Sequence, residues 1–130
     1  MSYVFDGSTP IYLQLIQLFS REIATGERSS GEKVDPVREL AVRYGVNPNT
    51  MQRALAAMES EGLMYSERTR GRFVTEDAER VRAVRRELAG KVLQDFVVQM
   101  KELRFTLGEA VDQVEQNWEV DHESHQHAQQ

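Results

Sequence analysis

The chain of 130 residues contains no cysteine, so it forms no disulfide, thiolate metal site or cysteine nucleophile. No apolar run approaches the roughly 20 residues that a membrane-spanning helix needs. Its start, MSYVFDGSTP, has neither the basic nor the apolar region of a secretion signal. We therefore expect a cytoplasmic protein with no membrane partner.

Catalytic motifs are also missing. The sequence has no Gly-rich phosphate loop, no nucleophile elbow and no metal-ligand spacing on a helix. The three histidines are His122, His125 and His127, in a polar tail that we expect to be disordered. Metal ligation needs a fixed geometry, which such a tail does not supply. The sequence predicts no enzyme, no cofactor and no bound metal, with a metal-binding tail as the less favoured alternative.

The net charge of −5 argues against a generic nucleic-acid binder, but the charges are unevenly placed. Residues 77–130 carry eleven acidic and seven basic side chains, whereas residues 38–74 carry six basic and four acidic ones. Three of those arginines fall within residues 68–72. Because a local patch decides what can contact a phosphate, the segment 38–74 remains compatible with nucleic acid.

Proline is scarce, and each of the three prolines stands at the start of a helical pattern. Each follows a residue that commonly caps helices, in Thr9-Pro10, Asp35-Pro36 and Asn47-Pro48. A capping side chain followed by proline suits a helix start, because the missing N–H would have no partner there. Glycines mark the expected ends of these three helices, at Gly26, Gly45 and Gly62.

A short hairpin should follow the third helix, because residues 63–67 and 72–75 alternate between apolar and polar side chains around an Arg-Thr-Arg-Gly turn. Two short helices joined at Gly45 and followed by a hairpin are typical of a winged helix-turn-helix. We therefore expect a mainly α fold with a small β-hairpin wing, and a winged helix-turn-helix DNA-binding domain over residues 9–76.

The C-terminal part predicts two further helices. One long helix should run from Asp77 to about Leu103, and a capping box of Thr106 and Glu109 should start a second one. We expect residues 77–119 to form a helical dimerisation region and residues 120–130 a disordered tail. The apolar stripe of both helices is too large to be buried within so small a unit, which indicates a homodimer. The predicted dimer interface is Val81, Val84, Leu88, Val92, Phe96, Met100, Leu103, Leu107, Val111, Val114 and Trp118.

Several short motifs appear in a characteristic order. They are Pro10-Ile11-Tyr12-x-Gln14, Val37-Arg38-Glu39-Leu40-Ala41, Gly45-Val46-Asn47-Pro48-Asn49-Thr50, Arg53-Ala54, Glu61-Gly62-Leu63 and Gly71-x-Phe73-Val74. With these motifs the chain resembles the GntR family of bacterial transcription factors, and its Asn-Pro-Asn-Thr run and short C-terminal part resemble the YtrA-like subfamily. The resemblance implies a homodimeric regulator of transcription, expected to be a repressor, that binds an inverted-repeat operator in double-stranded DNA. It also allows for a small-molecule effector, which the sequence does not identify.

The expected DNA-binding residues lie on the second and third helices and on the wing. In a helix-turn-helix the second of the two helices enters the major groove, and residues near its N-terminus meet base edges. The set is Arg38, Asn47, Asn49, Thr50, Gln52, Arg53, Arg70, Gly71 and Arg72. Arg53 is the residue most expected to read a base, because arginine pairs with guanine through two hydrogen bonds. The family resemblance implies a phosphate or groove-edge contact for Arg38.

Alternatives without a role in DNA binding remain open for these residues. Asn47 could serve only as a helix cap, and Gln52 and Arg53 could form a solvated face. Two departures from the family pattern also matter: Asp35 stands where a serine is usual, and the wing reads Thr69-Arg70-Gly71-Arg72 instead of Gly-x-Gly-Thr. They leave a second hypothesis, a winged-helix protein-interaction module with weak or no DNA binding.

Overall fold

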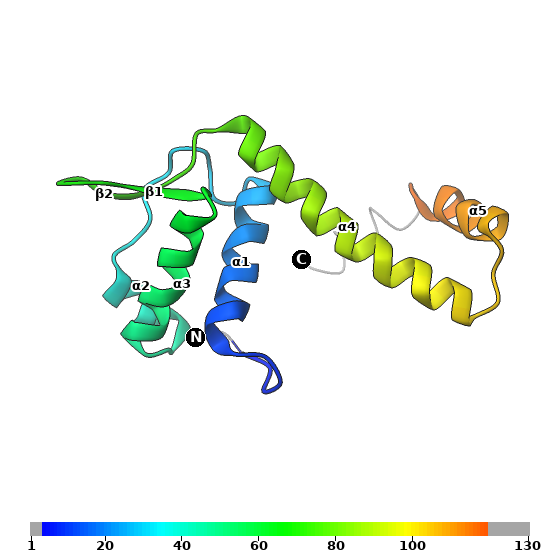
Figure 1. Ribbon diagram of the computed structural model, residues 1–130, viewed down its shortest axis with the longest axis horizontal. Coiled ribbons are helices and arrows are strands. Elements are labelled where there is room, and N and C mark those ends of the chain that lie inside the picture. Colours follow the sequence, from blue (N-terminus) through cyan, green and yellow to red (C-terminus); the bar gives the residue numbers. More distant parts are fainter. Residues whose placement is uncertain (1–3, 120–130) are drawn as a thin grey trace. The chain divides into compact units, whose positions relative to one another are not determined.

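The computed structural model describes residues 4–119 and places five helices and two strands in that range (Figure 1). The order is α1 (Ile11–Thr25), α2 (Val37–Tyr44), α3 (Pro48–Ser60), β1 (Met64–Glu67), β2 (Gly71–Val74), α4 (Ala78–Glu102) and α5 (Leu107–Asn117). This confirms the predicted mainly helical fold with one small hairpin. The chain divides into two compact units, one ending at Leu88 and one beginning at Ala89, so the division falls within α4. The predicted tail and its histidines lie outside the described residues.

The first two helices begin one residue later than the capping pattern predicts. Pro10 and Pro36 are themselves the N-cap residues, with extended ψ angles of 139° and 150°, and no side chain caps either helix. The predicted capping roles of Thr9 and Asp35 are therefore wrong. Asn47, in contrast, caps α3: its side-chain oxygen accepts a hydrogen bond from the backbone N–H of Asn49 at 2.7 Å.

The turn between α2 and α3 depends on Gly45. Its φ of 69° lies in the left-handed region, which glycine adopts without the steric cost that a Cβ brings. The backbone N–H of Val46 then donates to the carbonyl of Ala41 at 2.9 Å, which closes the end of α2. This turn sets the direction in which α3 leaves α2.

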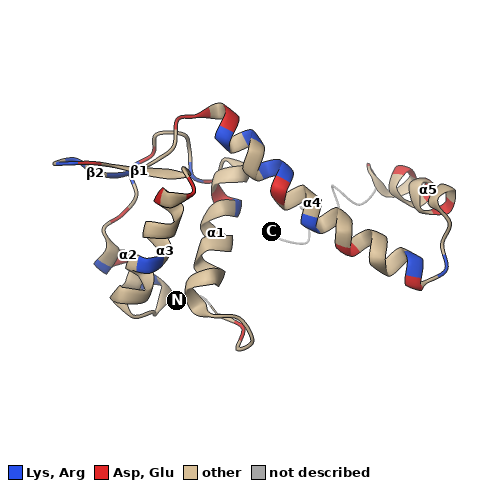
Figure 2. Cartoon of the chain, in the orientation of Figure 1, with Lys and Arg blue, Asp and Glu red and all other residues tan. Residues whose placement is uncertain are grey.

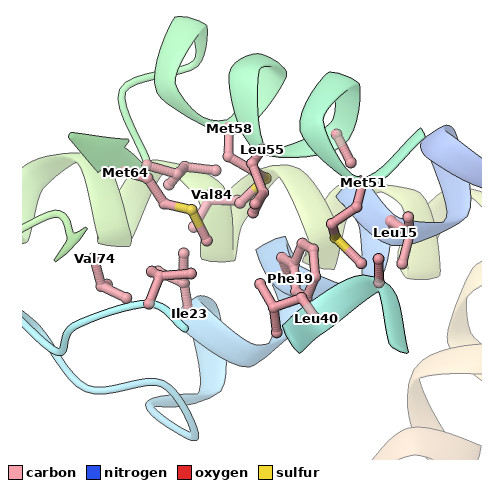
Figure 3. Close-up of a cluster of buried hydrophobic side chains, with 14 residues drawn as sticks. Leu15, Phe19, Ile23, Leu40, Met51, Leu55, Met58, Met64, Val74 and Val84 are labelled. Carbon is pink, nitrogen blue, oxygen red and sulfur yellow. The ribbon is translucent and has the colours of Figure 1, made fainter. Parts of the chain in front are cut away.

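The core of the first unit lies between α1, α3 and the hairpin (Figure 3). Among the contacts between elements, those between α1 and α3 are the most extensive. Fully buried side chains include Leu15 and Phe19 from α1, Leu40 from α2 and Met51 from α3. These residues hold α3 against α1 and leave its opposite side in solvent.

Three residues predicted for the dimer interface contact this core within the chain. Val84 of α4 is only 4% exposed and packs among the buried residues of the first unit, and Val81 and Leu88 pack against them. The first turns of α4 thus use their apolar stripe inside the chain, which leaves the remaining interface prediction to residues beyond Leu88.

A third segment, the connector between α1 and α2, extends the two-stranded hairpin. The strands pair antiparallel, with Met64 opposite Val74 and Glu67 opposite Gly71. The connector between α1 and α2 lies along the other edge of β2, where Lys33 forms a bridge with Phe73. Two 2.9 Å backbone hydrogen bonds fix it, from Val34 N–H to the Arg72 carbonyl and from Val74 N–H to the Glu32 carbonyl. We call β1, β2 and their turn the wing.

The second unit contains the rest of α4 and α5. Thr106 and Glu109 form the predicted capping box, with reciprocal hydrogen bonds of 3.2 and 2.9 Å. No residue of α5 is buried, and its apolar side chains are open to solvent, as in Leu107 at 82% and Trp118, next to its end, at 74%. In the described part of the chain no helix is long and apolar enough to cross a membrane.

Candidate nucleic-acid interface

Helix α3 separates its side chains into a buried and an exposed set. Met51, Ala54, Leu55 and Met58 are fully buried, whereas Asn49, Gln52 and Arg53 are exposed and Thr50 is half-buried. The pattern follows from the period of 3.6 residues per turn, because residues three or four apart share a face. Of the five residues predicted for this helix and its cap, Asn49, Gln52 and Arg53 are therefore open to solvent, Thr50 is half-buried, and the side-chain oxygen of Asn47 is occupied as the cap.

Arg53 lies against an aromatic ring from another helix. Its guanidinium carbon is 3.6 Å from the centre of the Tyr12 ring, and Tyr12 comes from the first turn of α1. Within residues 4–119 Arg53 forms no ion pair. The predicted base-reading residue thus keeps its charge uncompensated by any carboxylate.

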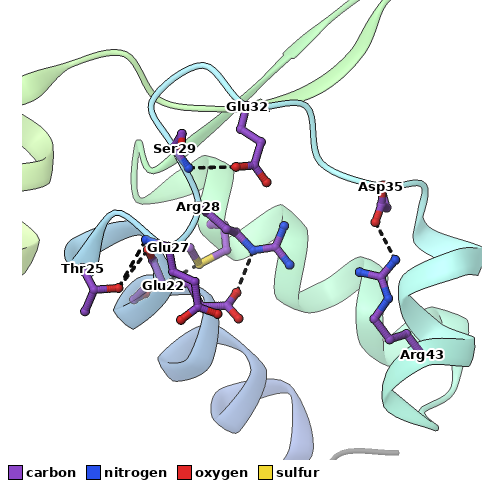
Figure 4. A network of polar contacts seen from close by, with 10 residues as sticks. Glu22, Thr25, Glu27, Arg28, Ser29, Glu32, Asp35 and Arg43 are labelled. Atoms are coloured by element: carbon purple, nitrogen blue, oxygen red, sulfur yellow. Dashed lines mark hydrogen bonds and ion pairs between the residues drawn. The ribbon is translucent and has the colours of Figure 1, made fainter. Parts of the chain in front are cut away.

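The second helix contributes Arg38 and a nearby ion pair. Arg38 is exposed and, in the part of the chain that the structure describes, has no acidic partner. Asp35 pairs with Arg43 at 2.6 Å (Figure 4). The negative charge expected to repel a phosphate at the start of α2 is therefore partly neutralised.

The two wing arginines of the prediction are both paired with carboxylates. Arg70 lies 3.0 Å from Glu67 in an exposed pair. Arg72 donates from Nε to Glu59 of α3 at 2.7 Å, and its side chain is only 16% exposed. The bond to Glu59 uses Nε alone, so the terminal nitrogens of Arg72 keep their hydrogen-bonding capacity. Gly71, between the two, has a φ of 114° that a side chain would strain.

A groove of about 490 Å³ lies between the wing and the connector before α2. Among its lining residues are the cations Lys33, Arg68 and Arg70. Arg68, at the wing tip, is exposed and pairs with no acid in the described range. Arg68 and Lys33 were both absent from the sequence prediction. The charge run at residues 68–72 could have pointed to Arg68, but nothing local in the sequence points to Lys33, which the fold brings to the wing beside Phe73 and Gly71.

Figure 2 shows basic residues at the wing tip, on α2 and on α3, where Arg53 is the only one, and further basic residues along the first half of α4. The one acidic residue of α3, Glu59, lies in its last turn, and Glu61 follows directly as the C-cap. The first unit thus presents cations where the helix-turn-helix fold places DNA, in spite of the negative net charge of the chain.

A largely buried ion pair supports this surface from behind. Arg28 lies 2.7 Å from Glu22 and 5.1 Å from the centre of the Phe19 ring (Figure 4). Burial lowers the pKa of Arg28, but the hydrogen bond and charge of Glu22 outweigh that effect and raise it. Burial, followed by the charge of Glu22, raises the pKa of the nearby Tyr44 phenol. The cluster holds the end of α1 to the end of α2 with the arginine charged and the phenol neutral.

The family profile described as "Bacterial regulatory proteins, gntR family" matches residues 11–74, which span all of the winged helix-turn-helix. The chain is also 39% identical over 112 residues to the uncharacterized HTH-type transcriptional regulator YhcF of Bacillus subtilis, across 86% of this chain and 93% of that protein. The chain belongs to the GntR family.

Other GntR proteins support this membership. The HTH-type transcriptional repressor YtrA of Bacillus subtilis is 40% identical over 72 residues, which cover 55% of each protein. A solved GntR family transcriptional regulator from Listeria monocytogenes superposes with a TM-score of 0.78 at 35% identity, over 86% of this chain and 98% of that one. The AraR DNA-binding domain, solved in complex with operator ORX1, is 30% identical with a TM-score of 0.51, over 55% of this chain and 93% of that one. As a GntR protein, the chain is a DNA-binding transcriptional regulator and not an enzyme.

The two departures from the GntR pattern have local structural consequences. Asp35 forms an exposed ion pair with Arg43 at 2.6 Å. The arginine at position 72 of the wing anchors β2 to α3 through Glu59. The second departure therefore adds a tether between the wing and α3, besides adding a positively charged side chain.

Proposed function

We propose that this GntR protein is a cytoplasmic repressor that binds an inverted-repeat operator as a homodimer. The observation that carries the proposal concerns two exposed arginines on the helix-turn-helix, Arg38 on α2 and Arg53 on α3, which form no ion pair within residues 4–119. An unpaired guanidinium on an exposed helix face is ready to bind an anion without first breaking an internal ion pair. The similarity to YtrA, which is named a repressor, supports repression as the outcome.

The proposed contacts divide into positioning and reading. Arg38 would bind a backbone phosphate, and the wing would approach the backbone through Arg70, Gly71 and the terminal nitrogens of Arg72. Arg53 would read a guanine in the major groove, with Asn49, Thr50 and Gln52 beside it on α3. Phosphate contacts fix the register on the duplex, and base contacts choose the sequence. Asn47 would act mainly through its cap, since its side-chain oxygen is already bonded.

The proposed dimer uses the apolar face of the second unit. The side chains of Val92, Leu93 and Val98 on α4 are more than half exposed, as are those of Leu103, Leu107 and Trp118. Large exposed apolar patches mark protein–protein contacts. Together with Phe96, Met100, Val111 and Val114, these residues would contact a second copy. A two-fold dimer would present two copies of α3 to half-sites about 34–36 Å apart, which accounts for an inverted repeat.

Occupancy of such an operator would block transcription. A small-molecule effector would act by favouring one arrangement of the dimer, and hence one half-site spacing, over another. Within residues 4–119 no group of three or more His, Cys, Asp or Glu side chains could hold a metal ion, so an organic ligand is the kind of effector we would look for first.

The test begins with selection of a duplex from a randomised DNA pool by the wild-type chain. Anisotropy would then compare that duplex with a shuffled one between about 50 and 200 mM salt. Tighter binding to the selected duplex, with affinity that falls steeply with salt, would support a sequence-specific regulator. Equally weak binding to both duplexes would contradict it and favour the protein-interaction module.

A further inference from the structure

We propose that Tyr12 is a specificity-determining positioning residue, whose ring holds the guanidinium of Arg53 in the orientation needed to read a base. The proposal rests on the proposed DNA-reading function of Arg53. Tyr12 lies on α1, outside the helix-turn-helix itself, so it would act through Arg53 and not as a contact of its own. The geometry that points to this role is the 3.6 Å separation between the guanidinium carbon and the centre of the ring.

A separation this short places the cation on the face of the ring. An arginine over an aromatic face is attracted by the ring quadrupole, and the attraction strengthens when water is excluded. The guanidinium carries its five N–H donors in its own plane. A ring that covers one face of the guanidinium leaves the N–H donors at its edge free. The same arginine can therefore still donate two hydrogen bonds to the O6 and N7 atoms of a guanine.

The ring itself is held in place by the fold. Tyr12 is half-buried and packs against the core of the first unit. The segment before it is fixed by Gln14, whose amide nitrogen donates to the carbonyls of Asp6 at 2.8 Å and Thr9 at 2.7 Å. The amide oxygen of Gln14 accepts from the Asp6 N–H at 3.0 Å. The Tyr12 ring under Arg53 is therefore held by the packing between α1 and α3. An arginine side chain that projects freely into solvent has no such restraint.

In the part of the chain that the structure describes, no carboxylate pairs with Arg53. The other two arginines of the first unit that lie over aromatic rings, Arg28 and Arg70, each also pair with a carboxylate. Among the described residues, Arg53 combines a ring contact with no acidic partner. An arginine held this way loses less conformational freedom when it binds a base edge. The ring also restrains Arg53 from turning toward a phosphate, a contact that would be the same on any DNA sequence.

The experiment compares four variants on the selected and shuffled duplexes: Tyr12→Phe, Tyr12→Leu, Arg53→Ala and the double variant Tyr12→Leu/Arg53→Ala. Gln17→Ala, at an exposed position of α1, is the matched control. Circular dichroism melts establish that each variant is folded. The readouts are the affinity for each duplex, the ratio of the two affinities, and the base preference at each position in a repeated selection.

We expect Tyr12→Phe to keep the affinity ratio, because phenylalanine retains the ring face. Tyr12→Leu should lower the affinity for the selected duplex by about twofold to tenfold, the cost of ordering one long side chain on binding expressed as a binding ratio. It should change the affinity for the shuffled duplex little. It should also erase the base preference at the same base pair where Arg53→Ala erases it. In the Arg53→Ala background, Tyr12→Leu should have no further effect.

Three results would overturn the role of Tyr12 while leaving the proposed function intact. Unchanged discrimination in Tyr12→Leu would show that Arg53 needs no platform. An equal loss in Tyr12→Phe would show that the hydroxyl contacts DNA directly. Tighter operator binding by Tyr12→Leu would show that the ring holds Arg53 away from the base. If the wild-type chain itself does not discriminate between the duplexes, the DNA-reading function is rejected, and the role of Tyr12 with it.

Discussion

Arg72 of β2 and Glu59 of α3 are joined by a 2.7 Å ion pair that links the wing to the recognition helix. Both side chains are mostly withdrawn from solvent, with exposed fractions of 16% and 29%. The pair therefore does more than a surface salt bridge, because less solvent is available to screen it. Two segments that should both meet DNA are mechanically connected by it.

We expect Glu59→Ala and Arg72→Ala each to lower the free energy of unfolding by about 1–2 kcal/mol, since each leaves a charged partner without its hydrogen bond. The double variant should lose little more than either single one. Urea unfolding of all three measures the coupling. The exposed Arg70–Glu67 pair is the matched control, for which a coupling below about 1 kcal/mol is expected. Additive losses at Arg72 and Glu59 would contradict the tether.

The cap at Asn47 gives a second prediction. Asn47→Ala should lower the free energy of unfolding by about 1 kcal/mol, because the N–H of Asn49 loses its acceptor. Asn47→Ser should restore most of that loss and keep operator affinity. Asn49→Ala is the control, since the Asn49 side chain makes no hydrogen bond within residues 4–119 and its loss should cost less than about 0.5 kcal/mol. Weak operator binding by a stable Asn47→Ser variant would show that Asn47 contacts DNA itself.

Substitutions that place charged side chains on the apolar face test the proposed dimer. Phe96→Glu combined with Leu107→Glu should convert dimers to monomers in sedimentation velocity, because two carboxylates would have to be buried in the contact. Val42→Glu is the control, as Val42 is exposed on α2, outside the second unit. A dimer that persists in the double variant would place the interface elsewhere.

The half-buried phenol of Tyr44 predicts loss of stability at alkaline pH. Burial and the charge of Glu22 raise the pKa of Tyr44 in the folded chain above its unfolded value of about 10. The neutral phenol is thus favoured by folding. Its stabilising contribution is fully present below the unfolded pKa and is lost as pH rises through the folded pKa.

Urea unfolding between about pH 9 and pH 11 should show this loss in the wild-type chain. Tyr44→Phe cannot ionise, so its stability should fall less steeply over the same range. Identical slopes in the two proteins would contradict the pKa assignment.

The sequence was sufficient to predict the elements whose signals are local. Gly26 and Gly45 end α1 and α2 in left-handed conformations, and Thr106 with Glu109 forms the capping box. The starts of α1 and α2 were off by one residue because an extended backbone suits both the residue before a proline and the proline itself. Only the observed φ and ψ angles decide which of them caps the helix.

Contacts between distant residues were beyond the reach of the sequence. The stacking of Arg53 on Tyr12, the pairing of Arg72 with Glu59 and the burial of Val84 each join different elements. Periodicity showed that Val84 belongs to an apolar stripe, but it could not show whether that stripe faces the same chain or another one. The local charge of the wing was visible in the sequence, whereas the division of its arginines between internal pairs and free groups was not.

The connector that runs beside β2 has a consequence for how the protein behaves at high concentration. A short hairpin alone would leave the backbone groups of both outer edges open to pairing with another molecule. Here Val34 and Glu32 already occupy hydrogen-bonding positions along β2. The β2 edge of the wing is therefore closed to strand addition by another molecule, and of the two outer edges only that of β1 is left without this cover in the described residues.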